Sequence, residues 1–225
     1  MGKSFPERIV EVYIGEYASG KSENAVNRAL ELKNAGRQVT LVDLDLVEPF
    51  YTLRFIKREL EEQGVNVIAW KTEATKGLGE AGCLLLPAMR WVLWREGDII
   101  IDVGYGVQGT QVLNLVEKYE EDPDIKVLAI INIARPLTST LDDILAYLQK
   151  LERVDGLINN SHLGEDTTID IVLNGEKIVR KVGEMLGIPV VATTVEKTFR
   201  GKMPKVVDRN IPIRYLTRYM QNSFW

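Results

Sequence analysis

Short β-branched runs alternate with helical patterns along almost the whole chain of 225 residues. Several runs are apolar throughout, as at Ile99–Ile101, which is typical of strands buried on both faces of a parallel sheet. Predicted strands lie at 9–14, 39–42, 65–69, 99–103, 127–131, 156–158 and 189–193, and predicted helices at 22–34, 49–63, 84–95, 108–120, 139–151 and 175–186. This alternation predicts βαβ units, and therefore a three-layer α/β fold with a mostly parallel sheet of about seven strands.

Length and composition predict one domain over residues 1–225, with its core at about 8–195 and a C-terminal tail at about 199–225. The chain has one cysteine, Cys83, and one histidine, His162, so neither an intrachain disulfide nor a four-ligand Cys/His zinc site can form. A net charge of −4 argues against general nucleic-acid binding. No signal-peptide core or membrane-length apolar run is present, and we expect a cytoplasmic location with no membrane role.

One glycine-rich segment carries the strongest functional signal in the chain. Residues 15–22, GEYASGKS, match the phosphate-binding pattern G-x-x-x-x-G-K-[ST] between a predicted strand and a predicted helix. The residues expected to touch a nucleotide here are Gly15, Glu16, Tyr17, Ala18, Ser19, Gly20, Lys21 and Ser22. Glycines let backbone N–H groups approach phosphate oxygens, and the helix N-terminus adds partial positive charge. Lys21 is the expected contact to the terminal phosphates and Ser22 the expected Mg²⁺ ligand.

Acidic residues end two of the predicted strands. Asp43 and Asp45 follow one strand, and Asp102 follows another, with Gly106 close behind. Because a metal-bound nucleotide in this architecture draws carboxylates from strand ends, Asp102 is the candidate that holds Mg²⁺ through water. Asp43 or Asp45 could complete the metal shell or orient the attacking water, and Gly106 could donate its N–H to the γ-phosphate.

In their order along the chain, these residues resemble the MinD/ParA/CobQ-type P-loop ATPases of the SIMIBI class, over roughly residues 8–195. The resemblance implies ATP and Mg²⁺ as ligands, with Asp43 near the metal and Asp45 near the hydrolytic water. It also implies that an asparagine after the sixth strand reads the adenine. Asn159 and Asn160 are the two candidates, and the family spacing favours Asn160.

The chain departs from that family pattern in two places. Dimerising members have a lysine directly after the first glycine of the motif, where this sequence has Glu16. A homodimer remains possible, but activation by such a lysine from a partner subunit is not. The usual D-T-P-A-G segment is replaced by residues 102–106, DVGYG. Neither departure removes the predicted nucleotide site.

Three functional hypotheses follow from these residues. The first is a slow ATPase that acts as a switch toward a protein partner, with segments 45–51 and 102–110 ordered by ATP and Mg²⁺. The second is a ligase or small-molecule kinase similar to dethiobiotin synthetase, with acceptor contacts from Lys71–Gly82, Arg54 or Arg135. The third is a nucleotide sensor that does not hydrolyse its ligand. The absence of an N-K-x-D motif favours adenine over guanine.

Several other residues have a structural and a functional interpretation. Arg135 could contact the nucleotide, but local pairing with Asp142 or Asp143 is the favoured interpretation. Cys83 is expected to be a small buried hydrophobe rather than a metal ligand, and His162 is expected in a loop at the pocket. Residues 209–225 are expected to form a helix that docks on the sheet rather than a membrane-binding tail.

Overall fold

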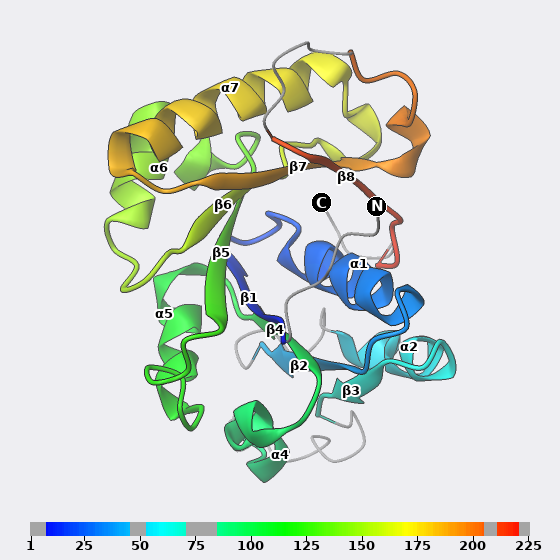
Figure 1. Cartoon of the computed structure of the whole chain (residues 1–225). Coiled ribbons are helices and arrows are strands. Elements are labelled where there is room, and N and C mark those ends of the chain that lie inside the picture. Colours follow the sequence, from blue (N-terminus) through cyan, green and yellow to red (C-terminus); the bar gives the residue numbers. More distant parts are fainter. Residues whose placement is uncertain (1–7, 46–52, 71–84, 205–210, 221–225) are drawn as a thin grey trace, which may run out of the picture. The chain divides into compact units, whose positions relative to one another are not determined.

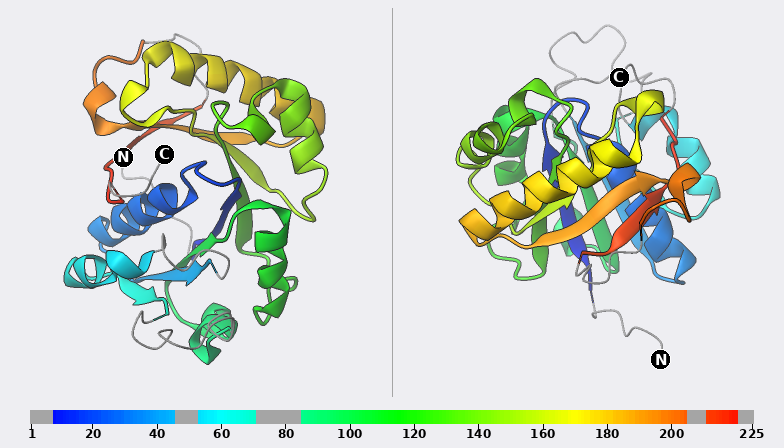
Figure 2. Two further views of the ribbon diagram at one scale, coloured as in Figure 1. Left: turned by 180° about the vertical axis from the view of Figure 1, so that it is seen from behind. Right: turned by 90° about the horizontal axis from the view of Figure 1, so that it is seen from above.

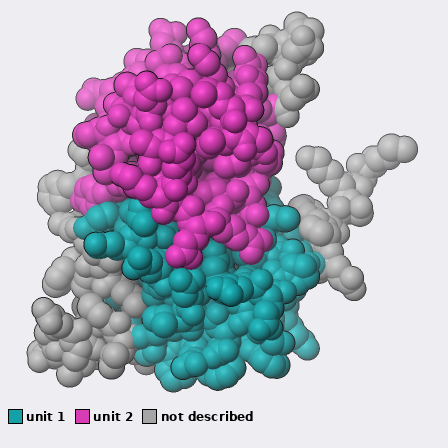
Figure 3. Space-filling model, turned by 90° about the vertical axis from the view of Figure 1, so that its left-hand side faces the viewer, with its two compact units in different colours: residues 1–13, 25–126 teal, residues 14–24, 127–225 magenta. Residues whose placement is uncertain are grey.

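The computed structural model describes residues 8–45, 53–70, 85–204 and 211–220. The chain divides into two compact units, which Figure 3 shows in separate colours. Unit 1 comprises residues 1–13 and 25–126, and unit 2 comprises residues 14–24 and 127–225. The single domain over residues 1–225 stays a prediction.

The strands form a sheet in the order β3-β2-β4-β1-β5-β6-β7-β8 (Figure 1). They are β1 Val10–Gly15, β2 Val39–Leu44, β3 Asn66–Ile68, β4 Asp98–Val103, β5 Ile125–Ile131, β6 Gly156–Asn159, β7 Val190–Glu196 and β8 Ile213–Leu216. Every registered strand pair within the described parts of unit 1 and unit 2 is parallel. The predicted α/β fold is confirmed, and all seven predicted strands are present.

The helices agree with the prediction less uniformly. They are α1 Lys21–Asn34, α2 Lys57–Glu62, α4 Pro87–Arg90, α5 Gly106–Thr110, α6 Leu141–Leu148 and α7 Ile169–Leu186. The long helix predicted at 108–120 is wrong, because α5 gives way to a short 3₁₀ turn at Gln111–Leu115 and the Glu117 N–H donates to the Arg90 carbonyl at 2.9 Å. None of the helices in the described ranges is long and apolar enough to cross a membrane.

In unit 2, helix α7 packs on strands β6 and β7 (Figures 1 and 2). The Thr168 hydroxyl caps its first turn by accepting from the Ile171 N–H, and Gly187 ends it with a left-handed φ of 68°. A Cβ at Gly175 would lie 2.1 Å from the Ser161 hydroxyl, so this glycine sets how closely the helix approaches the end of β6. The sequence predicted this helix but began it six residues too late, at 175 rather than at Ile169.

The prediction of a C-terminal helix is wrong for the described part of the tail, where strand β8 pairs with β7 in parallel. Pro212 has no N–H to donate and disfavours helix at the residue before it. Its carbonyl instead accepts from the Thr193 N–H at 3.0 Å. Ile213 and Tyr215, two residues apart, then face one side of the strand and pack on a small cluster that contains Val172 and Val195.

The buried Asp98 carboxylate connects Arg37 and the residue before the first strand within unit 1, and its removal tests how much this connection stabilises the fold. Asp98 is 1% exposed, accepts from the Ile9 N–H at 2.9 Å, and binds two nitrogens of the Arg37 guanidinium. Asp98→Ala leaves the partly exposed Arg37 guanidinium and a buried amide without their acceptor, so we expect a loss of about 1–3 kcal/mol in unfolding free energy. Urea denaturation followed by circular dichroism measures this loss.

The matched control is Arg58→Ala, which removes an exposed pair with Glu62 on α2. Exposed pairs of this kind contribute about 0.5 kcal/mol or less. Equal destabilisation by the two substitutions would contradict the role assigned to Asp98.

Candidate nucleotide site

The segment predicted to bind phosphate is in unit 2 and closely surrounded by backbone and side chains. Gly20 has a φ of 89°, and a Cβ there would lie 2.1 Å from Asn160 Nδ2. A Cβ at Gly15 would lie 2.6 Å from the carbonyl oxygen of Ile130 on β5. Both positions therefore require glycine, in agreement with the motif. Helix α1 begins directly after the loop at Lys21, with the Asn24 N–H bonded to the Gly20 carbonyl at 3.1 Å.

Lys21 and Glu16 are linked within this loop. Lys21 is 7% exposed, and its Nζ donates to the Glu16 carbonyl oxygen at 3.0 Å. Burial raises the pKa of the Glu16 carboxyl, and the nearby charges of Lys21 and Lys150 partly offset this. The same carboxylate contributes, after burial, to the raised pKa of Tyr147 on α6. The Glu16 carbonyl thus binds the Lys21 amine, while the Glu16 carboxyl interacts electrostatically with Tyr147 on α6 and with Lys150 after it.

The two candidate asparagines have different surroundings. Asn159 is fully buried, and its Nδ2 donates to the Val172 carbonyl of α7 at 3.1 Å while its Oδ1 accepts from the Ser161 hydroxyl at 2.7 Å. Asn160 instead donates from Nδ2 to the Ser19 carbonyl in the loop at 2.7 Å and accepts from the Thr194 hydroxyl at 2.7 Å. Asn159 therefore joins β6 to α7, whereas Asn160 joins β6 and β7 to the loop.

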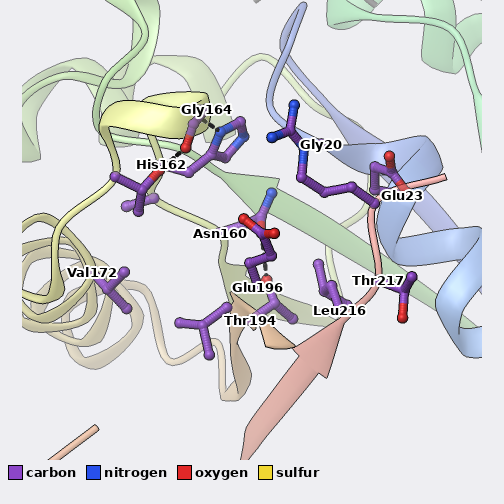
Figure 4. Close-up of a pocket in the computed structure, with 14 residues that line it drawn as sticks. Gly20, Glu23, Asn160, His162, Gly164, Val172, Thr194, Glu196, Leu216 and Thr217 are labelled. Atoms are coloured by element: carbon purple, nitrogen blue, oxygen red, sulfur yellow. Dashed lines mark hydrogen bonds between the residues drawn. The ribbon is translucent and has the colours of Figure 1, made fainter. Parts of the chain in front are cut away.

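A pocket lies in unit 2 beside the last glycine of the loop. Its lining residues are Gly20, Glu23, Asn160, Ser161, His162, Gly164, Thr167, Val172, Thr194, Val195, Glu196, Leu216, Thr217 and Arg218. Figure 4 shows His162, Gly164 and Val172 on one side, with Glu23, Leu216 and Thr217 on the other. The loop therefore ends where the pocket begins. The segment after β6, the end of β7 and the end of β8 with the residues that follow it supply most of the remaining wall.

Sequence reasoning missed the wall that β8 and the residues after it provide. Glu23, one residue after Ser22, accepts the Tyr219 N–H at 3.0 Å and the Met220 N–H at 2.8 Å. Burial raises the pKa of this carboxyl despite those two donors. We call this contact the Glu23 latch. No sequence motif predicts this contact, because it joins residues 196 positions apart in the sequence.

Arg135 does not pair with the acids that follow it in sequence, so the favoured interpretation of this residue is wrong. The Asp143 carboxylate serves a capping box with Thr140, bonding its N–H at 3.0 Å and its hydroxyl at 2.6 Å. Arg135 Nε instead donates to the Ala18 carbonyl at 3.0 Å. A residue more than a hundred positions away in sequence thus contacts the phosphate-binding loop.

His162 is a neutral hydrogen-bonding group at the pocket, as its predicted loop position suggested. The Gly164 N–H donates to its Nδ1 at 3.3 Å, so the proton is on Nε2. Nε2 lies 3.5 Å from the position of a Cβ on Gly20, beside the loop. Burial, aided by the charges of Arg135 and Arg218, lowers the pKa of His162 to about 4. The ring is therefore uncharged at neutral pH.

The predicted acidic residues come together in unit 1. Asp43 on β2 and Asp102 on β4 are partners in register, and they are 2% and 1% exposed. Asp43 also accepts from the Asp45 N–H at 3.0 Å and lies 3.9 Å from the Arg54 guanidinium. Within the described residues no three acidic, histidine or cysteine side chains cluster as a metal site. Paired carboxylates fit Mg²⁺ chemically, provided that further oxygens come from a ligand or from water.

The structure does not test every predicted site residue. Gly106 begins α5 with a left-handed φ of 70°, directly after the loop that follows β4. Cys83, Pro49 and the glycine-rich segment 71–82 lie outside the described residues. The first predicted switch segment, 45–51, is described only at Asp45, whereas the second, 102–110, is described throughout.

Comparison with known proteins shows similarity of fold but not of sequence. No family model matches the chain, and no curated protein sequence matches it. Among solved structures, the signal recognition particle receptor FtsY of Elizabethkingia anophelis in complex with GDP is similar with a TM-score of 0.60 and 16% identity, covering 87% of this chain and 59% of that one. FtsY of Thermotoga maritima has a TM-score of 0.55 at 17% identity, covering 84% of this chain and 62% of that one.

A third similar structure is the 54 kDa signal recognition particle protein of Aeropyrum pernix K1 in complex with GDP. Its TM-score is 0.51 at 18% identity, covering 82% of this chain and 41% of that protein. This chain therefore spans less than two thirds of each of these three proteins. At 16–18% identity, the likeness to these FtsY and signal recognition particle proteins shows the fold alone.

The Glu23 latch can be tested by proteolysis. Glu23→Ala removes the acceptor of two backbone N–H groups, each bonded to a charged carboxylate and worth about 1.5–3 kcal/mol. We expect trypsin to cleave after Arg218 at least about tenfold faster in this variant, because the segment opens more often. Mass spectrometry of timed digests measures the rate. The control is Glu184→Ala on the exposed face of α7, and equal rates in both variants would refute the latch.

The lowered pKa of His162 predicts a pH dependence of stability. The unfolded histidine, with a pKa of about 6.5, binds a proton more readily than the folded one, whose pKa is about 4. Stability should therefore fall as the pH is lowered from about 6.5 to about 4, by up to about 3 kcal/mol from this residue. Urea denaturation at several pH values measures it. His162→Asn should show a loss smaller by this amount, and parallel pH profiles would contradict the assignment.

Proposed function

We propose that this chain is a P-loop protein that binds a purine nucleoside triphosphate with Mg²⁺ and acts as a nucleotide-dependent switch toward a protein partner. The observation that carries the proposal is the junction at Gly20 and Asn160. There the phosphate-binding loop and the pocket share one wall, joined by the 2.7 Å bond from Asn160 to the Ser19 carbonyl. A polyphosphate in the loop would leave its nucleoside beside this wall.

The phosphate contacts are assigned to the loop. The backbone amides of residues 15–22 and the start of α1 supply donors, and Lys21 supplies the positive charge. The bond from Lys21 to the Glu16 carbonyl keeps the amine near the loop before any phosphate arrives. A γ-phosphate would replace that carbonyl as its stronger partner.

The base is assigned to the pocket, with Asn160 and His162 as the polar groups closest to Gly20. Two considerations point to different bases. The absence of N-K-x-D favours ATP, whereas the GDP complexes of similar FtsY and signal recognition particle proteins favour GTP. Glu196, which also lines the pocket, could accept from an amino group of either purine. Both nucleotides therefore belong in the first binding experiment.

The metal and hydrolysis roles follow the predicted residues. Ser22, Asp43 and Asp102 would hold Mg²⁺, directly or through water, and the metal would neutralise charge on the phosphates. Asp45 would orient the attacking water, and Gly106 would donate its N–H to the γ-phosphate. Segment 102–110 follows the Asp102 strand end and would change its order with the γ-phosphate, which makes it the described candidate for the surface that a partner reads.

Lys21→Ala provides the direct test. Removing the amine should weaken binding of the preferred triphosphate at least about a hundredfold, since a charge-assisted contact to phosphate is lost from a buried position. Isothermal titration with ATP and with GTP, each with Mg²⁺, measures this and identifies the base. Lys177→Ala, an exposed lysine on α7, is the matched control and should leave affinity unchanged. Unchanged affinity in Lys21→Ala would remove the proposed site.

A further inference from the structure

Arg135 lies in the segment between β5 and α6, whose backbone is fixed by hydrogen bonds of Asn132. The Asn132 side chain donates to the His162 carbonyl at 3.1 Å and accepts from the N–H groups of Ala134 and His162 at 3.0 and 3.1 Å. The Arg135 N–H in turn bonds the Asn132 carbonyl at 3.1 Å. The backbone that carries this arginine is thereby tied to the segment after β6, which lines the pocket.

The residue that Arg135 contacts has an uncommon backbone conformation. Ala18 has a left-handed φ of 53°, one of two positive values among the described non-glycine residues. A side chain disfavours this region, because Cβ crowds the following carbonyl. Ala18 must nevertheless adopt it where the phosphate-binding loop curves between Glu16 and Gly20. Its carbonyl oxygen receives the Arg135 Nε bond at 3.0 Å.

We propose that Arg135 is a positioning residue that holds the phosphate-binding loop in its binding conformation by fixing the Ala18 carbonyl. This inference rests on the proposed function. The hydrogen bond stabilises the left-handed conformation at Ala18 and so keeps the neighbouring amides directed toward the phosphates. Arginine suits this role because its guanidinium stays charged and its fork donates in a fixed direction.

The electrostatics of the loop are consistent with this role. Arg135 forms no ion pair within the described residues, so its half-buried charge adds to the positive potential beside the loop. The loop itself carries an acid, Glu16, two residues before Ala18. Arg135 therefore places a positive charge beside a phosphate-binding loop that contains the acidic residue Glu16.

A double-mutant cycle tests the inference, with titration of ATP and GTP as the readout. Arg135→Ala should weaken binding about tenfold or more, as expected for loss of a charge-assisted hydrogen bond. Ala18→Gly alone should change affinity little, because glycine adopts a left-handed φ without steric cost. In the Ala18→Gly background, Arg135→Ala should weaken binding by no more than about threefold, because the loop no longer needs the arginine to hold its shape. Arg180→Ala, an exposed arginine on α7, is the control.

Once the wild-type protein has been shown to bind a nucleotide, the outcomes of these variants test only the positioning role of Arg135. If Arg135→Ala binds like wild type, or merely lowers the melting temperature without changing affinity, the arginine has no positioning role. If the loss is equally large with Gly at position 18, Arg135 contacts the nucleotide directly and the inference is wrong. Failure of the proposed function is distinguishable, because wild-type protein would then bind neither nucleotide.

Discussion

The arrangement of the candidate site depends on one buried amide. Asn160 is 5% exposed and bonds the Ser19 carbonyl on one side and the Thr194 hydroxyl on the other, both at 2.7 Å. It therefore connects the phosphate-binding loop with the ends of β6 and β7. Because the amide passes so close to Gly20, any side chain at that position would displace it. The glycine of the motif is required here as much by the protein's own packing as by the ligand.

Around this amide, unit 2 places its cations without neutralising all of them. Arg135 donates to the Ala18 carbonyl, and Lys21 donates to the Glu16 carbonyl with its charge also acting on the Glu16 carboxyl. His162, next to both the loop and the pocket, is kept neutral by burial. The half-buried Arg135, which forms no ion pair within the described residues, gains more from an arriving anion than a cation already paired with an acid. This charge distribution favours a polyphosphate ligand.

Much of the fold could be predicted from the sequence, because buried parallel strands are locally apolar and the loop motif carries its own geometric requirements. The seven strands and the phosphate-binding loop illustrate this. Strand β8 was mistaken for a helix because it has only four residues, and the alternation of Ile213 and Tyr215 is too short a signal to indicate a strand. Its strand conformation depends on contacts with β7, which local patterns do not reveal.

The site shows the same division between local and distant information. The loop residues could be predicted because they belong to a motif with fixed spacing, and Asn160 was one of two asparagines that the family resemblance suggested. Their nucleotide contacts stay predictions. The bond from Arg135 to Ala18 and the Glu23 latch could not be, since each joins segments more than a hundred positions apart and depends on tertiary structure alone. Pairing of Arg135 with Asp142 or Asp143 was favoured because nearby charges are the only partners that a sequence displays.

The contribution of β8 and its following residues to the pocket has a consequence for the order of events during synthesis. The phosphate-binding loop is made early, at residues 15–22, whereas the opposite wall at Leu216–Arg218 leaves the ribosome about two hundred residues later. A nascent chain that stops before this strand has the loop but lacks one side of the pocket. A ligand that needs both walls could therefore bind only after strand β8 has been made.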